Sequence, residues 1–367
     1  MDDNKYTSRR IAALLEQYII ENQIATGVKI DSAAQLARKY AVSAKTADRA
    51  LNLLARRNLI TRIHGRGNFV KAYGETYNNK RVAFFCNVMH NPQDESIFST
   101  GIILVEICCS ILKEYGIKYE LLFKDDLFSR NSLLSESDFI KYDALLMSSM
   151  YRTCISDFAC KVPGNLILYG DDKVHIGPWH QVVYDYEPGF LKALQYCLKH
   201  HYRKFFIPGF SREVVRHRHQ ALLSVARKLK IPYSNFQFYY ANEYSSAILA
   251  GQNCARYFLQ NKLNDHVIIS SSDLITLGMV DVFKQQNLVN NSDYRIISYD
   301  NMQELFTDGK INLDMNSITH PIHKHAEALC SLLLDLLKKD TCFYRTYFTP
   351  ATELIIRHPF CGPANKK

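Results

Sequence analysis

Apolar residues recur every three or four positions in three stretches near the start of the chain. This spacing predicts amphipathic helices over residues 7–23, 33–40 and 44–57. The residues that can cap the second and third helices are Asp31 or Ser32, and Ser43. The side chains predicted to face inward are Ile11, Leu14, Leu15, Tyr18 and Ile19 in the first helix, Ala33, Leu36 and Ala37 in the second, and Ala47, Ala50, Leu51 and Leu54 in the third.

After the third helix the period changes to two. Residues 59–63 and 68–70 alternate as two short strands, and residues 64–67 (HGRG) form a turn between them. Two short helices joined by a tight connection, followed by a hairpin, are typical of a winged helix-turn-helix. We therefore expect a DNA-binding domain over residues 1–71 and a polar linker over residues 72–80.

Beyond residue 80, short apolar segments alternate with helical ones, which is typical of parallel sheets covered by helices. About 280 residues are long for one such sheet, so two lobes are expected. The predicted strands lie in residues 81–88, 118–123, 142–149, 162–170, 181–185, 203–210, 236–240, 266–270 and 294–300. The predicted helices lie in residues 97–115, 132–140, 187–200, 212–230, 244–261 and 273–287.

The charge distribution supports a nucleic-acid partner for the first domain. Residues 1–80 contain 14 Lys and Arg against 7 Asp and Glu, whereas the rest of the chain contains 31 against 29. A basic excess in one small domain suits phosphate binding, although a solvated basic face has the same composition. The ten cysteines form no CxxC pair, and no long apolar run is present. We expect reduced thiols, no membrane span and a cytoplasmic, nucleoid-associated protein.

The exposed residues of the third helix and of the hairpin define a predicted DNA-binding face. The first half of a recognition helix contacts base edges in the major groove, and a basic wing tip contacts the backbone or the minor groove. The predicted contacts are Ser43, Lys45, Thr46, Arg49, His64, Gly65 and Arg66. A winged helix that contacts another protein is the alternative.

This region resembles the GntR family of bacterial regulators. The resemblance rests on the segments SAAQLA, VS, RAL and GRGNFV, which occur in the family's order between residues 6 and 71. It implies a homodimer that binds an inverted repeat in double-stranded DNA. The chain departs from the family pattern at Asp31, Ala44, Asp48 and Asn58. A carboxylate at Asp48 would repel phosphate or accept a hydrogen bond from a cytosine amino group.

Polar side chains follow several predicted strands of the larger region. Parallel sheets bind ligands at the carboxyl ends of their strands. The residues there are Asn91, Phe98, Tyr169, Asp171, Asp172, Asp185, Ser271, Ser272, Asp273, Asp300 and Asn301. Asp273 and Asp300 are also good helix or turn caps, and Trp179 is either a stacking platform or a core residue. The His-x-His pairs on helices are spaced wrongly for a metal, so no metal or cofactor is expected.

The larger region resembles the sensor domain of lactose-repressor-type regulators, which is similar to periplasmic sugar-binding proteins. SSSDLITLGMVDVF followed by ISYDN carries this resemblance. It implies an effector-binding domain over residues 81–360. The implied N-terminal lobe comprises residues 81–183 and 319–341, and the C-terminal lobe comprises residues 184–318 and 342–360. The implied effector contacts are Phe98, Asp171, Arg218, Ser272, Asp273 and Asp300, with Arg216 as the alternative to Arg218.

The sequence therefore predicts a transcription regulator, with repression as the expected mode, controlled by a small polar effector. A sugar is the leading class, and a purine or another polar metabolite is the alternative. An enzyme on two α/β lobes with an appended DNA-binding domain is a competing hypothesis. The chain contains no GxSxG, no phosphate-binding GxxxxGK[ST] and no GxGxxG after a strand, so we expect no enzyme. A DNA-binding architectural protein without an effector is the third hypothesis.

Overall fold

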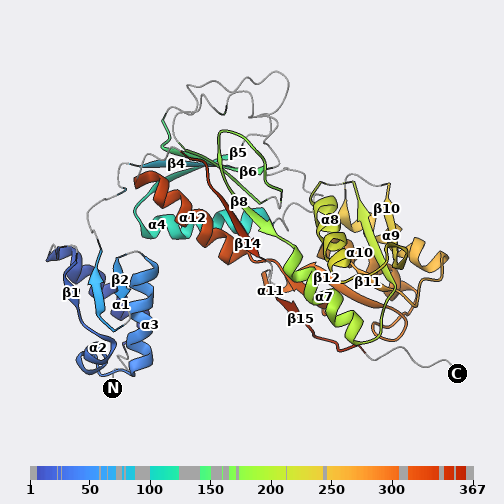
Figure 1. Ribbon diagram of the computed structural model, residues 1–367, viewed down its shortest axis with the longest axis horizontal. Helices are drawn as coiled ribbons and strands as arrows, with labels where there is room; N and C mark the ends of the chain where they lie inside the picture. The colour runs from blue at the N-terminus through green and yellow to red at the C-terminus, as the bar shows by residue number, and fades with distance from the viewer. Residues whose placement is uncertain are drawn as a thin grey trace. The chain divides into compact units, whose positions relative to one another are not determined.

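The computed structural model describes two compact units, residues 1–79 and residues 80–367 (Figure 1). Within them, the described residues are 6–22, 24–25, 27–57, 59–63, 65–71, 77, 80–86, 100–123, 141–149, 159, 165–170, 173–211, 213–242, 246–305, 313–338, 343–350 and 353–360. Over these described residues the fold is mixed α/β, with three helices in the first unit and two sheets in the second.

The first unit has the predicted helices and hairpin. Its helices are α1 (Ser8–Glu21), α2 (Ala33–Lys39) and α3 (Ala44–Arg56). Its strands are β1 (Lys29–Ile30), β2 (Ile60–Ile63) and β3 (Gly67–Val70), which pair antiparallel in the order β1-β3-β2. Ser32 and Ser43 cap α2 and α3 by accepting bonds from the amides of Gln35 and Thr46. Each cap satisfies a helix N–H that has no partner within its own helix.

The buried face of α1 is rotated about the helix axis relative to the predicted one. Ile11, Leu15 and Ile19 are buried as expected, but Ala12 is also buried, and Tyr18 is 52% exposed. A helix covers its partner with a stripe about 100° wide, and the stripe of α1 is centred closer to Ala12 than to Tyr18. Leu36, Ala47, Ala50, Leu51 and Leu54 are all fully buried in the same core, as predicted.

The first sheet of the second unit has the order β14-β8-β7-β6-β4-β5, with all pairs parallel. Its strands are β4 (Arg81–Cys86), β5 (Lys118–Phe123), β6 (Ala144–Ser148), β7 (Asn165–Tyr169), β8 (His180–Asp185) and β14 (Thr346–Pro350). Helices α4 (Thr100–Glu114) and α12 (Ile322–Lys338) pack on each other and on this sheet (Figure 1).

The second sheet has the order β10-β9-β11-β12-β13-β15, parallel except for the last pair. Its strands are β9 (Phe205–Phe210), β10 (Phe236–Ala241), β11 (Val267–Ile269), β12 (Arg295–Asp300), β13 (Asn316–Thr319) and β15 (Leu354–Ile355). Its helices are α7 (Glu187–Lys199), α8 (Glu213–Lys228), α9 (Ala247–Gln260), α10 (Asp273–Gln285) and the short α11 (Met302–Leu305), with a 3₁₀ turn at Tyr233–Asn235.

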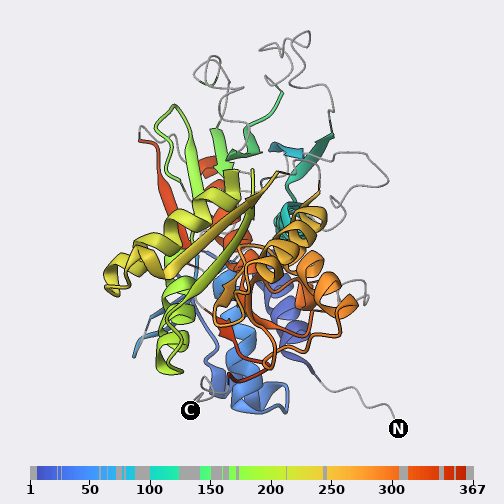
Figure 2. The ribbon, with the colours of Figure 1, turned by 90° about the vertical axis from the view of Figure 1, so that its right-hand side faces the viewer.

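Strand residues of the second sheet alternate between two cores, because successive side chains of a strand point to opposite faces. Phe205 and Ile207 pack with α7 and α8, whereas Phe206 packs with α9 and α10. Helices therefore cover both faces of this sheet (Figure 2). The nine predicted strands all occur, and the helix predicted at residues 132–140 lies outside the described residues.

The part of the chain after residue 300 differs most from the prediction. The strands β13, β14 and β15 and the long helix α12 are not among the predicted elements. The predicted division places all of residues 342–360 in the C-terminal lobe. Instead, β14 pairs with β8 in the first sheet, and only β15 joins the second sheet, where it pairs with β13. In the described part of the chain, the strands therefore change sheet three times, after β8, after β13 and after β14.

Candidate functional site

Two of the predicted DNA contacts form the start of the recognition helix. The Ser43 and Thr46 hydroxyl oxygens lie 2.8 Å apart, and the Thr46 amide donates to Ser43 Oγ at 3.1 Å. These contacts fix the first turn of α3. Lys45 and Arg49 extend from the same helix one turn apart and are exposed. The structure therefore presents two cations on one side of a well-capped helix.

The hairpin tip presents a third cation. Gly65 has a φ of +72° and Gly67 a φ of +121°, which are backbone conformations that residues other than glycine rarely adopt. Arg66 lies exposed between them. A methyl group on Gly67 would meet Cε of Lys29 at 2.6 Å, so this glycine also makes room for a neighbouring lysine. The predicted contact His64 lies outside the described residues.

Arg218 and Asp300 form a buried ion pair in the second unit. Arg218 extends from α8 and Asp300 ends β12, and the two side chains are joined by a contact of 2.8 Å from Nη2 to Oδ1. Their side chains are only 6% and 7% exposed. Nη1 of the same guanidinium donates to the Ser271 carbonyl. Arg216 is exposed, so Arg218 is the arginine that points into the fold.

Aromatic faces enclose the Arg218 guanidinium. Its Cζ lies 4.2 Å from the ring centroid of Tyr299 and 5.2 Å from that of Tyr186. Burial by itself lowers the pKa of Arg218, but the Asp300 carboxylate together with Tyr186 and Tyr299 acts in the opposite direction, and the net result is a raised pKa. The guanidinium therefore stays charged in an apolar environment.

The backbone at Asp300 is strained. Asp300 has a φ of +107°, and the next residue, Asn301, has a φ of +55°. Such conformations cost about 1–3 kcal/mol each and tend to occur at functional positions. Arg357 donates from Nη2 to Asn301 Oδ1 at 2.8 Å, which helps to hold the turn. Burial raises the pKa of Asp300, while Arg218 and the Ser272 hydroxyl act in the opposite direction.

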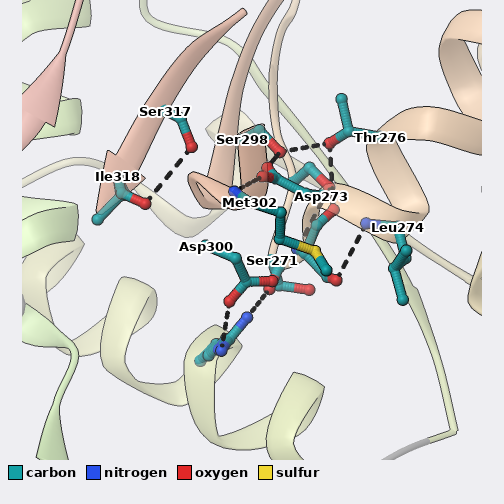
Figure 3. A network of polar contacts seen from close by, with 12 residues as sticks. Ser271, Asp273, Leu274, Thr276, Ser298, Asp300, Met302, Ser317 and Ile318 are labelled. Carbon is teal, nitrogen blue, oxygen red and sulfur yellow. Dashed lines mark hydrogen bonds and ion pairs between the residues drawn. The ribbon is translucent and has the colours of Figure 1, made fainter. Parts of the chain in front are cut away.

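Asp273 and Ser272 support this turn from the start of α10. The Met302 amide donates to Asp273 Oδ2 at 2.7 Å, and the Ser298 hydroxyl donates to Oδ1 (Figure 3). Burial, reinforced by the nearby Asp300 carboxylate, raises the pKa of Asp273 to about 7. Ser272 caps α10 by accepting from the Leu274 amide at 3.3 Å. Both side chains are engaged by the protein, and a direct effector contact from either one stays a prediction.

Several buried polar atoms around the ion pair have no hydrogen-bond partner among the described residues. They are Arg218 Nε, Ser271 Oγ, Tyr299 Oη and His320 Nδ1. His320 follows β13, and its amide donates to the Asp300 carbonyl at 3.3 Å. Buried polar groups are normally paired, so a cluster of unpaired ones is typical of a site that a polar ligand or water completes.

The sequence predicted only part of this cluster. Ser271 belongs to the set of polar residues at strand ends, but the prediction selected Ser272 and Asp273 instead. Tyr299 precedes Asp300 on a strand. Because successive side chains of a strand point to opposite faces, the sequence pattern does not place Tyr299 beside Asp300. His320 follows a strand that the sequence pattern did not reveal. The predicted contacts Phe98 and Asp171 lie outside the described residues.

Trp179 is a core residue. It is 5% exposed, and its Nε1 donates to the His175 carbonyl at 3.2 Å. Its ring lies so close to Gly177 that a methyl group there would meet the ring at 2.1 Å. The core interpretation of Trp179 is therefore confirmed, and the ring is not available as a stacking platform.

The two units match two different groups of bacterial proteins. Residues 7–70 match the model of the family of bacterial regulatory proteins known as the gntR family. The first unit is thus a GntR-type helix-turn-helix domain, and the match does not extend into the second unit. No curated protein sequence matches the chain.

The second unit has the fold of LacI-type sensors. A LacI family transcriptional regulator from Enterococcus faecium with bound ribose matches at a TM-score of 0.59 and 17% identity, covering 77% of this chain and 100% of that chain. A LacI family regulator from Weissella paramesenteroides with bound sucrose matches at 0.60 and 11%, covering 77% and 99%. One from Arthrobacter sp. FB24 in complex with lactose matches at 0.56 and 15%, again covering 77% and 99%. Among the described residues, no helix is long and apolar enough to span a membrane.

Proposed function

We propose that the protein is a transcription regulator that binds operator DNA through its first unit and a small polar effector through its second. The observation that carries the proposal is the buried Arg218–Asp300 pair with unpaired polar atoms beside it, in a chain that also contains a GntR-type domain. The expected mode is repression by a homodimer on an inverted repeat. We also propose that the protein catalyses no reaction.

The chemistry around the ion pair favours a sugar. A guanidinium donates and a carboxylate accepts, which suits the neighbouring hydroxyl groups of a polyol. Tyr299 Oη and Ser271 Oγ can each donate or accept a further bond. The similar regulators from Enterococcus faecium and Weissella paramesenteroides hold ribose and sucrose, which supports the same class of effector here.

Effector binding would act on the segments that join the two sheets. His320 lies between β13 and α12, directly after the strand that neighbours Asp300. A ligand that bonds to this cluster better in one arrangement of the lobes shifts the equilibrium toward that arrangement. The shift cannot exceed the ligand's difference in affinity between the two states.

The test uses the full chain and two measurements. Operator DNA is first selected from a random-sequence duplex pool, and selection of an inverted repeat is expected. A panel of neutral monosaccharides is then screened for an increase in Tm, because a ligand that binds only the folded state stabilises it. Asp300→Asn keeps the size of the side chain and should remove the increase. Enrichment of no sequence would overturn the regulator proposal, and an unchanged increase in the variant would overturn the site.

A further inference from the structure

A carboxylate on the recognition helix is bound to an arginine of the wing. Arg62 on β2 donates from Nη2 to Oδ1 of Asp48 on α3 at 2.5 Å. Its Nη1 donates to Asn52 Oδ1, one turn further along the same helix. Asn52 in turn donates from Nδ2 to the other Asp48 oxygen at 3.0 Å. Asp48 and Asn52 thus form a two-pronged acceptor for one guanidinium.

The network continues through the hairpin. Arg62 Nε donates to Asn68 Oδ1 on β3 at 3.3 Å. Asn68 is 5% exposed and donates from Nδ2 to the Asp31 carbonyl at 3.0 Å, just before α2. All three nitrogens of the Arg62 guanidinium are therefore engaged. They connect the recognition helix, both hairpin strands and the start of α2.

This arrangement changes the meaning of both charges. The Asp48 carboxylate has a cation of the same unit against it, so it neither repels phosphate freely nor is free to accept from a base. The Arg62 charge is compensated in the same way. Among the side chains that the structure describes on these elements, the exposed cations that remain for DNA are Lys45, Arg49 and Arg66.

We propose that Asp48 is a positioning residue that acts through Arg62 and sets the angle of the wing against the recognition helix. The inference rests on the proposed DNA-binding function. A specific site requires α3 to reach base edges while Arg66 reaches the backbone or the minor groove. Only a fixed angle lets both contacts form in one register. Non-specific binding needs no such register, so the network matters for the ratio of specific to non-specific affinity.

The expected effect is moderate. The side chains of Asp48 and Arg62 are 45% and 32% exposed, and an isolated pair with such exposure contributes little. A guanidinium held by three acceptors in fixed geometry orders the hairpin more strongly than one exposed pair. We expect the loss of the network to reduce the ratio of specific to non-specific affinity by about three- to tenfold.

The experiment is a double-mutant cycle on the full-length protein. Asp48→Ala, Arg62→Ala and the double variant are compared with the wild type for binding to a duplex selected by the wild type and to a random-sequence duplex. Asp48→Asn serves as a second variant that preserves shape if Asp48→Ala folds poorly. The matched control is Glu16→Ala, which removes another ion pair of the first unit, the 2.6 Å contact between Glu16 of α1 and Arg57, the residue after α3.

Three patterns separate the explanations. Equal losses of the affinity ratio in both single variants and in the double variant, with Glu16→Ala unchanged, support the positioning role. If Asp48→Ala tightens binding to both duplexes and does so equally in the Arg62→Ala background, simple repulsion explains the residue and the inference is wrong. Loss of discrimination at a single base pair in Asp48→Ala, but not in Arg62→Ala, would make Asp48 a base-reading residue and also overturn it. A wild type that selects no duplex would refute the proposed function itself.

Discussion

The ring of Tyr184 stacks on the imidazole of His325, with the ring centroids 3.9 Å apart. Tyr184 lies near the end of β8, and His325 lies in the first turn of α12. The centroid of the same tyrosine ring lies 4.3 Å from that of His320. The His320 ring in turn lies edge to face with the ring of Tyr299, with a centroid separation of 6.2 Å. A continuous series of rings thus runs from α12 and the end of β8 through His320 to Tyr299. The Tyr299 ring is the one that lies against the Arg218 guanidinium.

The buried histidines predict a loss of stability in mild acid. Burial lowers the pKa of His325 and of His219 to about 3, and that of His320 well below its usual value. Below a pH of about 6.5, the unfolded chain therefore binds more protons than the folded protein. The free energy of unfolding is fully retained above this pH and decreases as the pH falls below it. Each histidine contributes up to about 1.4 kcal/mol per pH unit below that point.

Urea unfolding between pH 7.5 and 5.5 measures this effect. Trp179, the single tryptophan, is buried in the first lobe and reports unfolding of the second unit by its fluorescence. His325→Gln removes one titrating group. The slope of the unfolding free energy against pH should then decrease by the amount that corresponds to one proton. A stability that does not change over this pH range would show that the histidines are not held neutral.

Removing one partner of the Arg218–Asp300 pair should destabilise the second unit strongly. Either Arg218→Ala or Asp300→Ala leaves an uncompensated charge in a buried site, which costs about 3–5 kcal/mol. The double variant Arg218→Met with Asp300→Leu removes both charges and should recover most of this loss. Denaturant titration followed by Trp179 fluorescence checks the order. If the double variant is as unstable as the two single losses added together, the pair is not the source of the effect.

Lys45 and Arg66 should each contribute to the salt dependence of DNA binding. Each phosphate contact that is removed should reduce the slope of log affinity against log salt by about 1. Lys45→Ala and Arg66→Ala are therefore compared with the wild type over a range of salt concentrations. Lys192→Ala, on the exposed side of α7, is the control of equal charge change. Identical slopes for all four proteins would contradict the assigned DNA-binding face.

Gly278→Ala should be one of the most damaging small substitutions in the second unit. A methyl group on Gly278 would lie 1.9 Å from the Ile248 carbonyl oxygen, where α10 crosses α9. Gly251 makes the reciprocal approach, at 2.0 Å from the Ile275 carbonyl oxygen. Because a backbone atom cannot move aside as a side chain can, we expect a cost of about 1–3 kcal/mol or more. Leu249→Ala, at a 46% exposed position of α9, should change the unfolding free energy far less.

The sequence predicted those helices and strands whose capping residues and hydrophobic pattern match the structure around them. Ser43 precedes an amphipathic helix and caps it, and the buried strands of both sheets read as short apolar runs. Arg218 and Asp300 were placed by resemblance and do meet in the structure. Arg218 lies within α8 and Asp300 is the last residue of β12, and the sequence pattern predicts both of these elements.

The contacts that the sequence could not supply are those between distant segments. Nothing near Asp48 in the chain reveals that Arg62 binds it, since the contact depends on the angle between a helix and a hairpin. Likewise β14, with the sequence TYFTP, carries exposed and buried residues in no regular order because it is an edge strand. Its pairing with β8 is set by tertiary structure alone.

The placement of β14 and β15 bears on how the protein is made. These two strands lie within 10 residues of each other, yet each completes the edge of a different sheet. During synthesis, neither lobe can finish its sheet until this late segment has left the ribosome, whereas the DNA-binding unit is complete after about a fifth of the chain. A nonsense mutation in the second unit before β14 would thus leave the DNA-binding domain foldable while both sheets of the second unit stay unfinished. We expect such a product to be degraded or to bind DNA without responding to an effector.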